Sequence, residues 1–439
     1  MEHVDSIIHA KWIIPVEPDE VIYENYSLTI KNGRIHSILP RAETSKQYES
    51  HETVDLSEHA LIPGLVNAHT HAAMSLFRGL ADDLPLMTWL NEHIWPAEAT
   101  WVNYDFVRDG TQLAIAEMVR SGTTCFSDMY FFPNEVAKAA SDCGMRAAVG
   151  MILIDFPTIW AKDTNEYFQK GLEVHEYYRN DPLISFTFAP HAPYTVSDEP
   201  LERAKALSEE LDIPIHIHVQ ETEDEVAQSM AQHEERPLQR LTKLDLLSPK
   251  LLAVHMTQLT SAEIEQLATT GCHVIHCPES NLKLASGFCP VASLLNAGVN
   301  VALGTDGAAS NNDLCMLGEM RSAALLAKAV AKNAAALPAH SALRMATLNG
   351  AKALGLSHET GSLTPGKAAD ITAIDLGELE SQPVYNPISH IVYTANRNQV
   401  TDVWVAGKAL LRNRTLTTID ISEIKQKTKT WQAKITTKK

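Results

Sequence analysis

Two histidines separated by one residue are the first candidates for chemistry in this sequence. His69 and His71 close the stretch Pro63–His71, which the apolar run Ala60-Leu61-Ile62 precedes. Since side chains alternate between the two faces of a strand, both imidazoles point the same way. Two imidazoles on one face supply half of a tetrahedral metal site, although one packed and one solvated histidine would give the same pattern. Any further ligands must come from elsewhere in the chain.

Polar residues recur at the ends of the apolar runs that follow this stretch. They are His191, His216, His218, Glu221, His255, His273, His276 and Asp306. A single such histidine would usually be a buried side chain with one satisfied hydrogen bond. Six of the eight apolar runs, however, carry at or near their end one of these residues or, in the first run, His69 and His71. Since polar groups are rarely buried without a partner, the pattern favours one shared site.

The apolar runs define the scaffold that must position these residues. From Leu61 onward they alternate with helical patterns, which is typical of repeated βα units. The runs cover residues 61–71, 123–128, 146–153, 184–191, 213–219, 251–255, 273–277 and 299–306. We therefore predict an α/β fold with a (β/α)8 TIM barrel, in which the C-terminal ends of the strands carry the chemistry.

The two ends of the chain predict a second, smaller domain. Residues 1–58 contain short strands, with a hairpin signal at Asn32-Gly33 and a polar, loop-like segment at 41–58. Strand character returns at 369–374, 391–394 and 403–411. We expect one small β-sandwich domain built from residues 1–58 and 361–439, with the barrel of residues 59–360 inserted between its halves. The lysine-rich tail at 425–439 predicts a loose terminal helix or a disordered end.

Composition and charge exclude several other classes. The 439 residues include 36 basic and 54 acidic side chains, which gives a net charge of -18. A chain this acidic binds nucleic acid and anionic membranes poorly, so we expect neither as a partner. No apolar run is long enough for a transmembrane helix, and the N-terminus lacks a signal-peptide pattern. Six scattered cysteines predict reduced, buried thiols in a cytoplasmic protein. The sequence leaves the oligomeric state open, and a homo-oligomer is possible.

The sequence resembles the amidohydrolase superfamily in four features taken together. These are the barrel inserted in a β-sandwich, the His-Thr-His stretch, the histidines of the fifth and sixth strands and the aspartate of the eighth. The resemblance covers the whole chain and implies that the metal ligands are His69, His71, His218 and Asp306. Residues 184–191 contain no lysine, where members with two metal ions place a carboxylated one, and this favours a single divalent ion. Three imidazoles and a carboxylate suit Zn²⁺, although Fe²⁺ or Mn²⁺ could substitute.

The same resemblance implies catalytic roles. His216 and His218 share a face, but His218 begins the His-x-x-Glu spacing to Glu221 and lies nearer the strand end, so we assign it as the ligand. Asp306 would take a proton from the attacking water, and Glu221 would protonate the ring nitrogen beside the reacting carbon. A helix N-terminal carboxylate is the alternative interpretation of Glu221, and it does not exclude that role. His255 matches the histidine that orients the water and shuttles its protons.

A sharper resemblance narrows the substrate. Segments 95–98, 189–194, 276–281 and 304–307 are similar to those of the 5-methylthioadenosine/S-adenosylhomocysteine deaminases, which are related to the triazine hydrolases. The resemblance implies that the adenine of such a nucleoside is converted to hypoxanthine with release of ammonia. Glu98 would bind the ribose hydroxyls, and His191 would donate to a purine nitrogen or a sugar oxygen. The other expected substrate contacts are Glu221, Asp306 and Trp89, which with Leu86 and Met87 would form an apolar wall for the thioether side of the substrate.

The sequence departs from that family at one point, and alternatives stay open. The family places an arginine near the end of the third strand, whereas Arg146 lies at its start here, which leaves the contacts to the 5′ substituent open. A hydrolase of guanine or of a triazine would keep the metal site without a ribose contact. A cyclic-amide hydrolase would usually need the missing lysine of the fourth strand. A non-catalytic scaffold on this fold would typically have lost ligands that this chain keeps.

Overall fold

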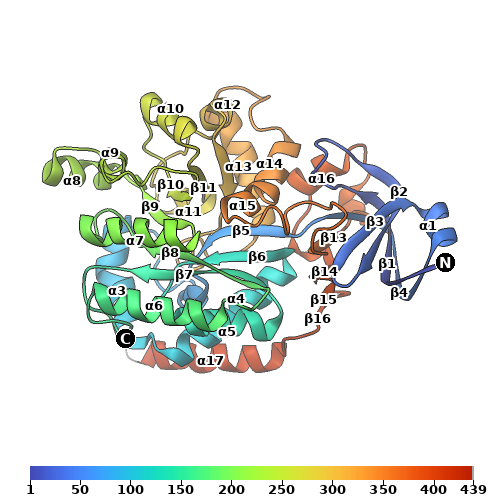
Figure 1. Ribbon diagram of the computed structural model, residues 1–439, viewed down its shortest axis with the longest axis horizontal. Helices are drawn as coiled ribbons and strands as arrows, with labels where there is room; N and C mark the ends of the chain where they lie inside the picture. The colour runs from blue at the N-terminus through green and yellow to red at the C-terminus, as the bar shows by residue number, and fades with distance from the viewer. Residues whose placement is uncertain (438–439) are drawn as a thin grey trace.

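The computed structural model describes residues 1–437 and contains two eight-stranded sheets (Figure 1). One sheet is the predicted barrel. Its strands are β5 (Leu65–Thr70), β6 (Thr123–Asp128), β7 (Arg146–Leu153), β8 (Ile184–Pro190), β9 (Ile215–Val219), β10 (Leu251–His255), β11 (His273–His276) and β12 (Asn300–Leu303). They follow one another in chain order, and each neighbouring pair is parallel. Because such strands are buried on both faces, they produce the continuous apolar runs of the sequence.

The barrel closes between its first and last strands at the edge where the polar residues gather. The Asp306 N–H donates to the His69 carbonyl over 3.0 Å, and the Asn67 side chain bonds Thr305 through both its oxygen and its nitrogen. Gly304 permits this close approach, because a Cβ there would lie 2.8 Å from the His69 Cβ. The closure therefore sets His69 and Asp306 next to each other.

The second sheet joins both ends of the chain. Its strands are β1 (Glu2–Ile13), β2 (Tyr23–Lys31), β3 (Arg34–Pro40), β4 (Tyr48–Pro63), β13 (Ile371–Asp375), β14 (Val400–Val405), β15 (Lys408–Arg412) and β16 (Thr415–Leu416). The strand order is β16-β15-β14-β13-β4-β1-β2-β3, so β4 from the N-terminal part pairs with β13 from the C-terminal part. Leu28, Leu61 and Trp404 are buried in a core of its own. The predicted fold class, a TIM barrel inserted in a small β-domain from both chain ends, is confirmed.

Helices link the strands of both sheets, and most of them cover the outside of the barrel (Figure 1). They are α1 (Arg41–Gln47), α2 (Leu86–Thr88), α3 (Trp95–Trp101), α4 (Tyr104–Arg120), α5 (Pro133–Cys143), α6 (Thr164–Tyr178), α7 (Asp198–Leu211), α8 (Glu223–His233), α9 (Pro237–Lys243), α10 (Ser261–Thr270), α11 (Pro278–Lys283), α12 (Val291–Asn296), α13 (Met316–Val330), α14 (Ala339–Met345), α15 (Leu348–Ala353), α16 (Pro387–Tyr393) and α17 (Ile421–Thr437). Four short elements complete the set: the 3-10 helices η1 (Ala72–Phe77), η3 (Leu379–Ser381) and η4 (Arg397–Gln399), and the π-helix η2 (Trp89–Ile94). Helix α1 joins β3 to β4 of the small sheet and contacts it. In Figure 1, α4, α5 and α6 lie outside β6, β7 and β8, as βα alternation requires.

Several element predictions are wrong in detail. The run at 61–71 is split, because β4 of the small sheet ends at Pro63 and β5 of the barrel begins at Leu65. The predicted loop at 41–58 is helix α1 followed by part of β4, whose exposed residues give it a polar character. The predicted strand at 391–394 lies mostly in helix α16, which begins where Asn386 accepts from the Ser389 N–H. The predicted strand at 403–411 falls in the β14–β15 hairpin.

The lysine-rich tail forms helix α17, which is packed rather than loose. Trp431 is buried, and its indole N–H donates to Asp109 Oδ2 over 3.0 Å. Its ring meets Phe106 of α4 edge-on, with 5.2 Å between ring centroids. The helix is therefore fixed to the barrel as far as Thr437, and the last two residues of the predicted tail lie outside the described part.

The predictions for the cysteines and for membrane-spanning helices can be compared with the structure. All six cysteines are buried and unpaired, as the sequence predicts. Within residues 1–437, no helix has both the length and the apolar character that are needed to cross a membrane.

Candidate active site

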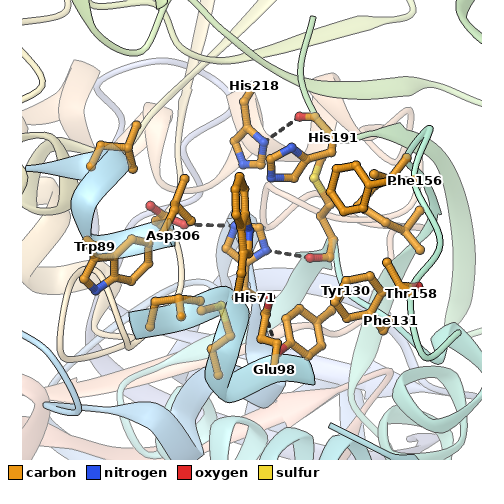
Figure 2. A pocket seen from close by; sticks show the side chains of 18 of the residues that line it. His71, Trp89, Glu98, Tyr130, Phe131, Phe156, Thr158, His191, His218 and Asp306 are labelled. Atoms are coloured by element: carbon orange, nitrogen blue, oxygen red, sulfur yellow. Dashed lines mark hydrogen bonds and ion pairs between the residues drawn. The ribbon is translucent and has the colours of Figure 1, made fainter. Parts of the chain in front are cut away.

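Four polar side chains from three strand ends converge at the C-terminal edge of the barrel. Figure 2 shows three of them, His71, His218 and Asp306. His69 lies one residue before the end of β5 and His71 directly follows that strand, His218 lies in β9, and Asp306 follows β12. The Nε2 atoms of His69 and His218 are 3.1 Å apart. Asp306 Oδ1 lies 3.4 Å from His69 Nε2 and 3.2 Å from His71 Nε2. The structure thus brings the whole predicted ligand set together.

Hydrogen bonds behind the imidazoles fix how the rings point. His71 Nδ1 donates to the Met129 carbonyl and His218 Nδ1 to the His191 carbonyl, each over 2.6 Å. A proton on Nδ1 leaves the Nε2 lone pair free to face the centre of the cluster. His69 Nδ1 is 2.9 Å from His216 Nε2, so His216 lies one layer below and orients a neighbour. This agrees with the interpretation of His216 as a buried residue with a satisfied hydrogen bond.

Asp306 is held as an ionised carboxylate. Its Oδ2 accepts from the hydroxyls of Ser280 and Ser310 over 2.6 and 2.9 Å. Burial acts to raise its pKa, but hydrogen bonds with His69 and His71 hold that pKa well below the usual 3.8. Burial also acts to lower the pKa of His71, yet Asp306 raises it to about 9. A buried carboxylate needs a cation beside it, and in this cluster a proton or a metal ion can fill that place.

The donor atoms are close enough for a divalent metal. Those of His69, His71 and Asp306 lie within 4.8 Å of one another, and so do those of His69, His218 and His255. Three imidazole nitrogens and a carboxylate oxygen form a set that first-row divalent metals bind. The residues present therefore fit the predicted metal site.

Glu221 and His255 lie beside this cluster and are both buried. Burial raises the pKa of Glu221 above its usual value. Its backbone N–H donates to Glu225 Oε2 over 2.6 Å, which fixes the turn at the end of β9. His255 Nε2 is 3.7 Å from Glu221 Oε2, and its Nδ1 is 2.8 Å from Asn281 Oδ1. The structure thus places both predicted proton-transfer residues next to the cluster.

A cavity of about 300 Å³ opens from this cluster, a volume suited to a small organic molecule. Glu98 lies in its wall, where Glu98 Oε1 accepts from the Tyr130 hydroxyl over 2.7 Å (Figure 2). Burial raises the pKa of Glu98 to about 7, against the opposing effect of the Tyr130 hydrogen bond. The predicted ribose-binding carboxylate therefore faces the same cavity as the metal cluster.

Only some of the remaining predicted substrate contacts line the cavity. His191, Trp89 and Leu86 line the cavity, whereas Met87 is not among the residues that line it. Figure 2 shows Trp89 on the side of Asp306 and Phe156 on the opposite side. Trp89 is thus not next to Phe156.

Arg146 lies far from these contacts, at the start of β7. Its Nε donates to Asp370 Oδ2 over 2.9 Å, and both side chains are buried. This ion pair joins the N-terminal end of the barrel to the small sheet. Arg146 therefore holds the two domains together at the end opposite to the cavity.

The sequence prediction missed one whole wall of the cavity. The missed residues include Trp95, Tyr130, Phe131, Ile152, Ile154, Phe156 and Ile159. A signal for two of them was present, because the unbroken run 129–132 of Met, Tyr, Phe and Phe follows a strand end where a polar loop is usual. The wall after β7 had no such signal beyond its apolar composition.

Comparison with known proteins agrees with this geometry. Residues 60–410 match the amidohydrolase family. A 5-methylthioadenosine/S-adenosylhomocysteine deaminase of Teredinibacter turnerae is 52% identical over 436 residues, which cover 99% of each chain. The chain belongs to the amidohydrolase family and is a hydrolase that acts on C–N bonds.

Two solved structures are also similar. A structure of an adenosine deaminase from Xanthomonas campestris with bound zinc has a TM-score of 0.98 and 52% identity, and the match covers 99% of both chains. An atrazine chlorohydrolase from Arthrobacter aurescens TC1 complexed with zinc has a TM-score of 0.90 at 23% identity, covering 97% of this chain and 99% of that one. The second likeness shows the fold alone.

Proposed function

We propose that this chain is a metal-dependent deaminase that hydrolyses the adenine of 5′-methylthioadenosine, S-adenosylhomocysteine or a related adenosine to hypoxanthine and ammonia. One observation carries the proposal: a single cavity joins the His/Asp cluster, the buried Glu221 and the carboxylate of Glu98. The names of the relatives at 52% identity support the same substrate class. Six unpaired thiols further support a cytoplasmic enzyme.

The proposed cofactor is one divalent ion, with zinc as the best fit. His69, His71, His218 and Asp306 would hold it, since their donor atoms already face one centre. When bound, such an ion supplies Lewis-acid activation of water near neutral pH. Zinc bound in the structure from Xanthomonas campestris supports this choice of metal.

The proton transfers are assigned to three side chains of this chain. Asp306 is ionised and can accept a proton from the water that attacks the ring carbon bearing the amino group. Glu221 has a raised pKa and can hold a proton to give to the adjacent ring nitrogen, which removes negative charge as the bond forms. His255, fixed by Asn281, orients the water and passes the proton that Asp306 has taken from it to the amino group, which then leaves as ammonia.

Two further residues hold the nucleoside. Glu98 keeps one oxygen on Tyr130 and offers the other to the ribose hydroxyls. His191 is neutral, because burial lowers its pKa to about 3. Its Nδ1 lies 2.9 Å from Thr195 Oγ1, which can donate to it and leave the Nε2–H free to donate into the cavity. These contacts set the base toward Glu221 and Asp306.

The test is ammonia release from a panel of adenosines, guanine and a triazine, using enzyme loaded with zinc. We expect rapid release from 5′-substituted adenosines and little from the other two compounds. Turnover of guanine or the triazine without turnover of any adenosine would refute the nucleoside assignment and keep the hydrolase class. Inactivity on every compound, with the metal bound, would refute the deaminase assignment itself.

A further inference from the structure

The part of the cavity beyond Glu98 is an apolar wall. Trp95 stands three residues before Glu98 in helix α3, so the two side chains share a face of the helix. Trp95 meets the ring of Phe156 edge-on, with 6.3 Å between centroids. Ile154 and Ile159, from the connection between β7 and α6, extend the same wall. If Glu98 binds the ribose, this wall is what the 5′ substituent meets.

At this wall the cavity opens to solvent, and the side chains at the opening are apolar. Phe156 is 42% exposed and Ile159 is 59% exposed, although large apolar side chains are usually covered. Both line the cavity, so a ligand that reaches the mouth would cover them. An alkylthio group is apolar and polarisable, and sulfur contacts aromatic rings favourably.

No cationic side chain faces this wall within residues 1–437. The residues that line the described cavity include no lysine and no arginine, and its carboxylates are Glu98, Glu221 and Asp306. Arg146 is bound to Asp370 at the other end of its strand. Lys162 lies on the same connection and Lys170 in helix α6, but neither lines the cavity. Lys170 donates to the Trp160 carbonyl over 2.5 Å, and Lys162 is exposed.

We infer that this wall, which we call the thioether wall (Trp95, Ile154, Phe156 and Ile159), selects a neutral 5′-alkylthio group and discriminates against the amino-acid tail of S-adenosylhomocysteine. The inference rests on the proposed function. That tail carries a carboxylate and an ammonium, which find no charged partner on this wall and lose water where they lie against its buried part, beside Ile154. A methylthio group needs no partner and gains from burial. The chain is thus a deaminase of 5′-alkylthioadenosines in preference to nucleosides with charged tails.

The first experiment compares kcat/KM for the two substrates with zinc-loaded enzyme. We expect 5′-methylthioadenosine to exceed S-adenosylhomocysteine roughly 10- to 100-fold, the effect of one missing charge-assisted hydrogen bond. Ile159→Arg then supplies the missing cation at an exposed position, so the fold should tolerate it. This variant should lower the ratio about tenfold, by gaining on S-adenosylhomocysteine. Leu325→Arg, at a residue 53% exposed on α13 and outside the cavity, controls for the added charge and should leave the ratio unchanged.

The outcomes separate this inference from the proposed function. Equal kcat/KM for both substrates would overturn the inference and leave the deaminase assignment standing. A selective loss of S-adenosylhomocysteine turnover in Lys162→Ala would show that a surface lysine binds the tail, and would overturn it as well. An unchanged ratio in Ile159→Arg would mean that the tail does not meet this wall. Absence of deamination of any adenosine would instead refute the proposed function.

Discussion

Replacing Glu98 with glutamine tests whether this side chain binds ribose. Glu98 Oε1 accepts from the Tyr130 hydroxyl, which leaves Oε2 as the acceptor for a ribose hydroxyl. In Glu98→Gln the amide oxygen can still accept from Tyr130, so its NH₂ group would face the ribose and replace an acceptor with a donor. At least one charge-assisted hydrogen bond is lost, which costs about 1.5–3 kcal/mol. We expect kcat/KM for the ribonucleoside to fall roughly 10- to 150-fold.

The assay is a cycle in which the second change is made in the substrate. A 2′,3′-dideoxy analogue lacks the hydroxyls, so Glu98→Gln should cost it little. The metal content should stay the same, because Glu98 is not among the proposed ligands. Glu92→Gln, at an exposed position in the preceding π-helix η2, is the matched control and should behave like wild type on both substrates. An equal loss on both substrates would refute the ribose contact and make Glu98 a structural residue.

Four further results are expected. Glu221→Gln should retain metal and substrate affinity but lose roughly 10²–10⁴ in kcat, and retention of most activity would remove Glu221 from the mechanism. Chelation should abolish activity while circular dichroism stays close to native, and one equivalent of zinc should restore it. Arg146→Ala should lower the free energy of unfolding by about 3–5 kcal/mol in a urea titration, because it leaves Asp370 buried and unpaired. Burial raises the pKa of Glu319 well above its usual value, so the unfolded chain loses this proton at a lower pH than the folded one, and the free energy of unfolding falls as the pH rises. Glu319→Gln removes this effect, so its melting temperature should rise relative to that of the wild type between about pH 6 and pH 8.

The barrel strands and the polar residues at their ends could be predicted from the sequence for a physical reason. Strands buried on both faces must be apolar throughout, so β6, β7 and β10 were predicted with the bounds that the structure shows. Polar residues at the ends of such strands stand out against that background. This contrast singled out the polar residues at the strand ends before any geometry was known, and the resemblance to the amidohydrolases then selected His69, His71, His218 and Asp306 among them.

The remaining features depend on contacts between residues far apart in the chain. The Glu98–Tyr130 hydrogen bond links a helix after β5 to the residues after β6, and no local pattern encodes it. The first part of β4 was missed because the successive residues His51, Glu52 and Thr53 are all exposed, so no apolar alternation marks the strand. Helix α16 was taken for a strand because Ile391 and Val392 have strand propensity that tertiary packing overrides. Three of the four residues of the thioether wall lie in the connection between β7 and α6, whose conformation is set by the barrel that it covers.

The pairing of β4 with β13 also constrains how the protein is made. Pro63 pairs with Ile371, so the ribosome must complete the whole barrel before β4 meets its second neighbour. Until then one edge of β4 is unpaired, and an open strand edge is a site for association with other nascent chains. Truncated chains that end before β13 keep the whole barrel with all four proposed ligands but leave this edge of β4 open, so they should depend on chaperones.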